Sequence, residues 1–288
     1  MRKSVRNISK TASTFWRIVG GNVLKLRIIT ALVILAIGLP LLYFGGLTFQ
    51  LSIVGLATIC FMEIMHMAKI KIPSPEVIIG LLATIGLTIP ITYYNYFRMT
   101  PLLWLCLCSF ALLVLTVFSK NEFSFEKVGI VSLAALYIGL GAHHVLILRE
   151  YGFVAILFIF SIGWITDSGA YFVGRRFGKH RLAPHISPNK SIEGSVGGTA
   201  LAVLYALIFV AIHQPFATLS LDFLGTILLA FGVSLAGQMG DLVESALKRF
   251  YHVKDSGNIL PGHGGVLDRF DSTLFGVVAC HIILICLI

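Results

Sequence analysis

Apolar residues occur along this chain in runs of about twenty, which short polar segments interrupt. A helix of that length crosses the roughly 30 Å hydrocarbon core of a bilayer. The pattern therefore predicts an all-α, polytopic integral membrane protein with about nine transmembrane helices. Their expected ranges are 28–44, 47–68, 77–93, 101–118, 128–148, 152–173, 196–213, 223–245 and 272–288. The run at 128–148 is the weakest, because it contains Gly139, Gly141, His143 and His144.

Basic residues indicate how these helices are oriented. With the N-terminus in the cytoplasm, all of the 22 Lys and Arg residues except Arg98 and Arg149 lie on the cytoplasmic side. Cytoplasmic segments of membrane proteins carry such an excess of Lys and Arg. Residues 1–27 then form a basic leader at the membrane surface, and residues 28–288 form one transmembrane domain.

Composition agrees with this class of protein. The chain is 57% hydrophobic and only 12% charged, far from the average of a soluble domain. Its net charge of +9 is explained by cations that face an anionic leaflet, so nucleic acid is not expected as a partner. The five cysteines all lie in apolar runs without a metal or disulfide spacing, and we assign them no chemistry.

Acidic residues inside the runs carry the candidate chemistry. Asp167 lies eight residues before Arg175, and Asp241 lies seven residues before Lys248, so both are expected roughly 10–12 Å below the same membrane surface. Asp268 and Asp271 enter the last helix from that side. An ionised carboxylate in hydrocarbon is costly unless it faces a partner, a metal or water. The convergence of four carboxylates therefore predicts a metal site or a cation path.

The eighth predicted helix carries a polar stripe. Asp241, Glu244, Ser245 and Lys248 follow the i, i+3, i+4, i+7 spacing of one helix face. Glu244 either pairs internally with Lys248 or contributes to the metal site, and the spacing leaves both open.

The segment "LPGHGGVLDRFD" at 260–271 is too polar for a membrane span and too rich in glycine for a helix interior. The last helix needs to begin near Val266 or Leu267 to be long enough to cross a bilayer. His263, Gly264 and Gly265 then lie at its entrance, where free backbone N–H groups favour an anion such as phosphate. Carboxylates for a divalent ion beside donors for phosphate suit a nucleotide bound with Mg²⁺.

These residues resemble a known signature. Residues 245–271, "SALKRFYHVKDSGNILPGHGGVLDRFD", are similar to the signature of the phosphatidate cytidylyltransferase (CDP-diacylglycerol synthase) family. Three shorter segments are also similar to that family: "LKLRIITAL" at 24–32, "TDSGAY" at 166–171 and "SPNKSIEG" at 187–194. None of these segments falls within residues 45–150, for which only the apolar pattern supports the interpretation.

The resemblance implies an enzyme that joins CTP to phosphatidic acid, releases pyrophosphate and leaves CDP-diacylglycerol in the bilayer. It implies Mg²⁺ as cofactor and leaves open a second, monovalent or divalent, cation. It also implies a homodimer, and an active site on the cytoplasmic face of the bacterial inner membrane. The expected catalytic residues are Asp241, Asp268, Asp271, Lys248, Arg249 and His263, and the expected metal ligands are Asp241, Asp268, Asp167 and Glu244.

Substrate contacts are expected from two segments. The loop 175–194 contains Gly178 and Lys179, but its spacing does not match a phosphate-binding P-loop. Its family-like part is expected to bind nucleotide or lipid phosphate, together with residues of the signature. The candidates are Ser187, Asn189, Lys190, Ser191, Ser245, Lys254, Gly264, Gly265 and Arg269.

Other interpretations stay open from the residues alone. A secondary transporter would also contain intramembrane acids, but its polar residues should gather at the midplane. A polyprenol kinase or a cytidylyltransferase for an ether lipid would share much of this chemistry. Glu63 is intramembrane and six residues before Lys69, which permits either an internal ion pair or a functional role. His143, His144 and His281 are expected to be packing residues.

Overall fold

The computed structural model describes residues 26–216 and 221–287. Most of the leader therefore lies outside the described residues. A first helix, Leu26–Phe44, is followed by α2 (Gly46–Met67), α3 (Pro75–Thr88), α4 (Ile91–Phe97), α5 (Pro101–Phe118) and α6 (Phe125–Glu150). The second half contains α7 (Phe153–Phe177), α8 (Ile192–His213), α9 (Phe223–Phe250) and α10 (Leu267–Leu287).

Eight helices of the described chain are long and apolar enough to cross a membrane, so the polytopic all-α prediction is confirmed. The predicted span 77–93 is the exception, because Pro90 divides it into α3 and α4. The residue before a proline avoids the helical region, and Ile89 accordingly has a ψ of 149°. With 14 residues, α3 is only about 21 Å long, shorter than the hydrocarbon core.

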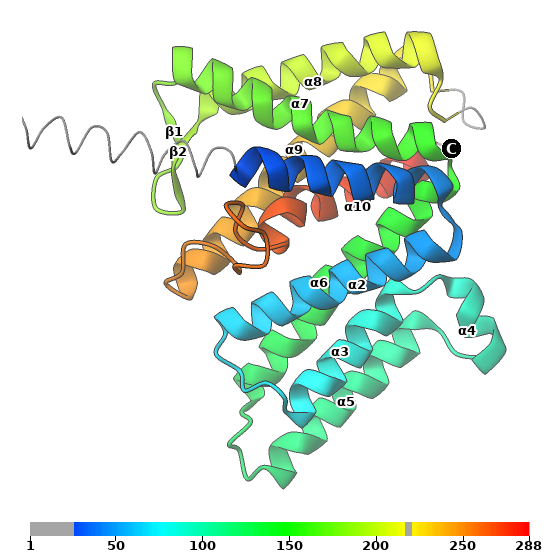
Figure 1. Cartoon of the computed structure of the whole chain (residues 1–288), viewed down its shortest axis with the longest axis vertical. Coiled ribbons are helices and arrows are strands. Elements are labelled where there is room, and N and C mark those ends of the chain that lie inside the picture. Colours follow the sequence, from blue (N-terminus) through cyan, green and yellow to red (C-terminus); the bar gives the residue numbers. More distant parts are fainter. Residues whose placement is uncertain (1–25, 217–220, 288) are drawn as a thin grey trace, which may run out of the picture.

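The helices form two packed groups (Figure 1). In one group α6 is central, with contacts to α2, α3 and α5. In the other, α7 packs along α8, and α9 packs along α10. Contacts of α6 with α10 and α7 join the two groups. Helices α7, α9 and α10 are therefore neighbours, and they carry the four predicted carboxylates.

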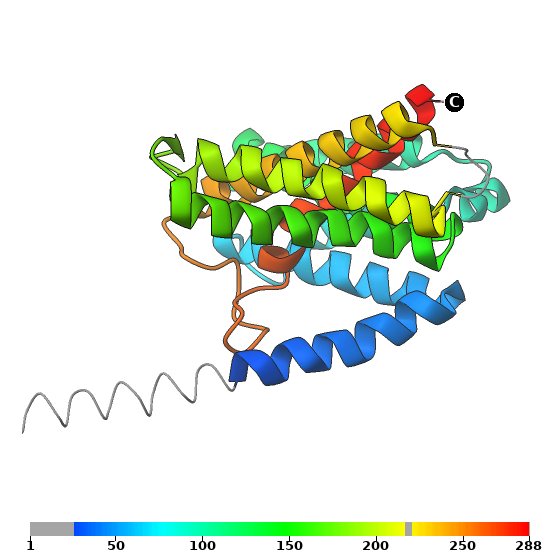
Figure 2. The same cartoon turned by 90° about the horizontal axis from the view of Figure 1, so that it is seen from above.

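Two small irregular elements lie at one end of this bundle. The strands β1 (Arg181–Ala183) and β2 (Ser187–Ser191) form an antiparallel hairpin between α7 and α8. The loop 251–266, between α9 and α10, lies at the same end in both views (Figures 1 and 2). No strand was predicted at 181–191, so the hairpin adds to the all-α expectation.

The first helix lies at the edge of the bundle, and the loop 251–266 reaches to its start (Figure 2). Arg27 Nε donates to Gly262 O at 2.9 Å, and Thr30 Oγ1 donates to Pro261 O at 3.0 Å. At the other end of the first helix, Arg149 of α6 donates to Leu42 O and Tyr43 O. The first helix is therefore fastened at both ends, and one attachment point is the signature loop.

Candidate active site

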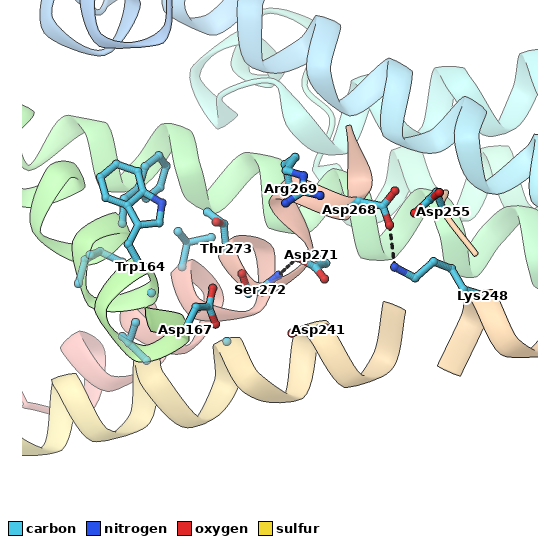
Figure 3. Close-up of a pocket in the computed structure, with 17 residues that line it drawn as sticks. Trp164, Asp167, Asp241, Lys248, Asp255, Asp268, Arg269, Asp271, Ser272 and Thr273 are labelled. Atoms are coloured by element: carbon cyan, nitrogen blue, oxygen red, sulfur yellow. Dashed lines mark hydrogen bonds and ion pairs between the residues drawn. The ribbon is translucent and has the colours of Figure 1, made fainter. Parts of the chain in front are cut away.

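Five aspartates converge on one cavity of about 410 Å³ between α7, α9 and α10 (Figure 3). They are Asp167, Asp241, Asp255, Asp268 and Asp271, and we call this space the aspartate cavity. Only two basic side chains, Lys248 and Arg269, also line it. The predicted convergence of Asp167, Asp241, Asp268 and Asp271 is therefore observed, with an excess of negative charge.

Asp268 lies in the first turn of α10 and is the most fully hydrogen-bonded of these carboxylates. Its Oδ2 accepts from Ser256 N at 2.9 Å, from Ser256 Oγ at 3.0 Å and from Gly265 N at 2.8 Å. Its Oδ1 accepts from Lys248 Nζ at 2.6 Å. Asp268 thus ties the signature loop to both helices.

Lys248 lies between two carboxylates, since its ammonium contacts Glu244 of its own helix as well as Asp268. The side chain of Glu244 is 0% exposed and does not line the aspartate cavity. Of the two alternatives for Glu244, the structure favours the internal pair with Lys248.

The other carboxylates have fewer partners inside the protein. Asp241 forms an ion pair with Lys190 and accepts from Ser245 Oγ at 3.3 Å. Asp271 accepts at Oδ1 from the backbone N–H of Ser272 at 2.7 Å. Asp167 is exposed to the cavity and has no hydrogen-bond partner among the described residues. These three side chains retain free lone pairs for a ligand.

A second cavity of about 680 Å³ lies under the hairpin, and we call it the hairpin cavity. Asp167 and Asp241 line both cavities and so form their common wall. The predicted substrate residues Ser187, Asn189, Lys190 and Ser191 line this second space. Arg175 and Arg181 add positive charge.

Local contacts fix the hairpin above this cavity. Ser191 caps α8, because its Oγ accepts from Gly194 N at 3.1 Å. Arg249 Nε donates to Ile186 O at 3.3 Å and so fastens the turn of the hairpin to α9. Ser191 and Arg249 therefore have structural contacts. Ser191, a predicted substrate residue, also lines the hairpin cavity, whereas Arg249, which was expected to be catalytic, lines neither cavity.

The prediction of free phosphate donors at the glycine segment is wrong for this structure. Gly264 N donates to Leu260 O, and Gly265 N donates to Asp268. The next two N–H groups, of Val266 and Leu267, both donate to Glu63. The helix entrance begins at Leu267, as expected, but side chains and backbone of the protein already occupy its donors.

The remaining signature candidates are peripheral to the two cavities. His263 accepts at its carbonyl from Arg269 Nη2 at 2.7 Å, and its Nδ1 is buried without a partner among the described residues. Lys254 is exposed and lines neither cavity. Ser245 donates a hydrogen bond to Asp241 but lines neither cavity.

Sequence reasoning did not find the role of Glu63. Glu63 lies on α2 and is 4% exposed, and its carboxylate accepts three hydrogen bonds from the signature region. No ion pair with Lys69 occurs in the described chain. The only signal was an acid within an apolar run, because about 200 residues separate Glu63 from its partners.

The donor chemistry of the aspartate cavity fits a hard divalent cation. The described residues contain no group of three His, Cys, Asp or Glu side chains placed to hold a metal by themselves. Mg²⁺, however, is commonly held by one or two carboxylates together with substrate phosphates. Five aspartates against two basic side chains leave negative charge that such a cation would neutralise.

Fold and site together define a polytopic membrane protein whose acidic and basic cavities meet at one end of the bundle, an arrangement suited to phosphate chemistry. The chain belongs to the cytidylyltransferase family, whose pattern matches residues 25–287. It is similar to a protein of Bacillus subtilis, with 43% identity over 258 residues that cover 88% of this chain and 94% of that protein. Proteins of Staphylococcus epidermidis and Staphylococcus aureus are 42% and 40% identical, and each alignment covers 91% of this chain and 99% of the relative. All three relatives are named phosphatidate cytidylyltransferase.

Proposed function

We propose that this chain is a CTP:phosphatidate cytidylyltransferase, which converts CTP and phosphatidic acid into CDP-diacylglycerol and pyrophosphate. The observation that carries the proposal is the pair of cavities that share Asp167 and Asp241. A water-soluble substrate and a lipid need separate approaches to one reaction centre, and the two cavities supply them. The names of the relatives support the same reaction.

We assign the nucleotide to the hairpin cavity. Its lining combines the charges of Arg175, Arg181 and Lys190 with the polar side chains of Ser187 and Asn189. Arginine grips two phosphate oxygens at once, and lysine supplies a mobile point charge. A triphosphate held here lies beside the aspartate wall.

We assign the lipid headgroup to the aspartate cavity. Its lining changes from aspartates to the apolar side chains of Ile159, Phe160 and Trp164 on α7. Trp164 is 51% exposed on the outside of the bundle, so acyl chains can leave the cavity along this part of α7. Arg269 and Lys248 are the basic side chains available to the lipid phosphate.

Cytidylyltransferases of this kind generally use a divalent metal, and we propose Mg²⁺. Asp241 and Asp271, with Asp167 beside them, would hold it, because they have the fewest donors inside the protein. When bound, the ion neutralises phosphate charge at the centre of the reaction. Asp268 is assigned to holding Lys248 and the loop, since its two oxygens already accept four hydrogen bonds.

In the reaction, an oxygen of the lipid phosphate forms a bond to the α-phosphorus of CTP. The bond from that phosphorus to the bridging oxygen breaks, and pyrophosphate leaves with the electron pair. The residues of the chain position the two phosphates and neutralise their charge, which is the dominant contribution of a protein to phosphoryl-type transfers.

We place the protein in the cytoplasmic membrane, with the hairpin and the signature loop facing the cytoplasm. The distribution of Lys and Arg supports this orientation. It also gives the hairpin cavity direct access to cytoplasmic CTP. A homodimer stays a prediction.

The test is an assay of the purified protein in detergent with CTP, Mg²⁺ and phosphatidic acid. We expect release of pyrophosphate and formation of CDP-diacylglycerol, and loss of both on chelation of the metal. Replacing CTP by ATP separates a cytidylyltransferase from a lipid kinase. An ether-linked phosphatidic acid tests the ether-lipid alternative. Absence of product from folded protein would refute the assignment.

A further inference from the structure

We propose that Glu63 is a positioning residue for the reaction, acting from α2 through the start of α10. It holds the N-terminus of α10 so that Asp268, Arg269 and Asp271 face the aspartate cavity. The catalytic part of this inference depends on the proposed function. The geometry on which it is based does not.

Glu63 forms the N-terminal cap of α10 from a distant part of the chain. Its Oε1 accepts from Val266 N at 2.8 Å, and its Oε2 accepts from Leu267 N at 2.9 Å. The first N–H groups of a helix have no partner inside the helix, and the helix dipole favours negative charge at that end. A single carboxylate therefore satisfies two of these donors and fixes the direction in which α10 begins.

The same carboxylate is linked to Asp268 through Ser256. Ser256 Oγ lies 3.0 Å from Glu63 Oε2 and 3.0 Å from Asp268 Oδ2. A serine hydroxyl carries one hydrogen, so it donates to one of these acceptors at a time. Ser256 N donates to Asp268 in addition, at 2.9 Å. The loop is thus held between an acid of α2 and an acid of α10.

Two glycines of the signature are explained by this contact. A Cβ at Gly257 would lie 2.5 Å from Glu63 Oε1. A Cβ at Gly265 would lie 2.6 Å from Glu63 Oε2 and 2.0 Å from Ser256 Oγ. An alanine at either position would therefore force the Glu63 carboxylate or the loop itself to move.

Glu63 lines neither the aspartate cavity nor the hairpin cavity, so it does not contact a substrate held in either of them. It also has no basic side chain in ion-pair contact within the described chain. A buried carboxylate without a cation is costly, and here only backbone and hydroxyl donors offset that cost. A role in placing Asp268 and Asp271 accounts for its presence on α2.

The test begins with Glu63→Gln, which keeps the side-chain volume but replaces one acceptor by a donor. We expect kcat to fall roughly 10- to 100-fold, as for residues that orient a site from behind it. The KM for CTP should stay within about twofold of wild type, because we assign CTP to the hairpin cavity, which Glu63 does not reach. Glu63→Asp keeps the charge and should recover part of the lost kcat.

Glu126→Gln is the matched control, because Glu126 is an exposed acid in the first turn of another helix, α6. It should leave kcat unchanged. Hydrogen exchange without substrate gives a second measurement. We expect faster exchange in a peptide covering residues 256–270 of Glu63→Gln, and unchanged exchange in residues 181–194.

A wild-type kcat together with wild-type exchange in Glu63→Gln would overturn the proposal. If that variant does not fold, Ser256→Ala decides: faster loop exchange with lower kcat supports the proposal, and unchanged values reject it. If the wild-type protein has no cytidylyltransferase activity, the proposed function fails. The exchange experiment would still determine whether Glu63 holds the start of α10.

Discussion

Lys190 of β2 and Asp241 of α9 form an ion pair at the wall that the two cavities share. Asp241 lines both cavities, and Lys190 lines the hairpin cavity. Both side chains are partly exposed, at 28% and 33%, so the pair is accessible to incoming ligands. A pair of this kind contributes at most about 1 kcal/mol to stability. Under the proposed function, its importance therefore lies in what each partner would bind when substrates arrive: phosphate for Lys190 and a cation for Asp241.

Replacing Lys190 tests the first half of that relationship. In Lys190→Gln we expect kcat/KM for CTP to fall roughly 10- to 100-fold, because a charged contact to phosphate is lost. Thermal stability in detergent should change little. Lys179→Gln is the matched control, since Lys179 is exposed in the same loop and lines neither cavity. Equal kcat/KM values in the two variants would remove Lys190 from the nucleotide site.

Replacing Asp241 tests the second half. We expect Asp241→Asn to lower turnover by roughly 100-fold or more at saturating Mg²⁺, because charge stabilisation at the reaction centre is lost. Asp222→Asn is the control: Asp222 caps the other end of the same helix by accepting from Gly225 N at 2.6 Å. It should affect stability slightly and turnover not at all. Near-normal turnover in Asp241→Asn would exclude Asp241 as a metal ligand.

The Lys248 cluster yields a prediction about stability. Lys248→Met would leave Glu244, which is 0% exposed, and Asp268 without their shared cation. Removing one partner of a buried pair costs about 3–5 kcal/mol. We expect a clearly lower thermal unfolding temperature in detergent.

The double variant Lys248→Met/Glu244→Gln provides the internal check. It removes the buried negative charge together with its partner, and it should recover part of the lost stability. If the double variant is as unstable as Lys248→Met alone, the cost does not come from the uncompensated charge of Glu244.

Regular features of the fold and site were predictable from the sequence because they depend on local spacing. The helical rise and the positions of Arg175 and Lys248 predicted that Asp167 and Asp241 lie at the same level, and both line one cavity. The break at Pro90 could also have been predicted, since proline restricts the residue before it. Hydropathy alone does not reveal the break, because the apolar run continues through the proline.

The contacts of the signature loop were not predictable in this way. Glu63 and Leu267 are 204 residues apart, and nothing in the local sequence of either indicates the other. Gly257 and Gly265 lie within the signature, but nothing in the sequence around them indicates that both approach Glu63. The glycine segment therefore resembles a phosphate site in sequence, whereas in the structure its N–H groups at 265–267 donate to carboxylates of the protein.

Close packing of α7 on α8 positions the hairpin cavity, and Gly198 tests it. A Cβ at Gly198 would lie 2.5 Å from Thr166 O and 2.9 Å from Ala170 N, next to Asp167. Gly198→Ala should therefore force the two helices apart, at a cost of about 1–3 kcal/mol. We expect a lower unfolding temperature and a raised KM for CTP. Gly55→Ala on α2 is the control, because its Cβ would meet nothing within 4 Å, and it should unfold at or above the wild-type temperature. Should Gly198→Ala unfold at the wild-type temperature with an unchanged KM, the approach of α7 to α8 at Asp167 would not be a determinant of the nucleotide site.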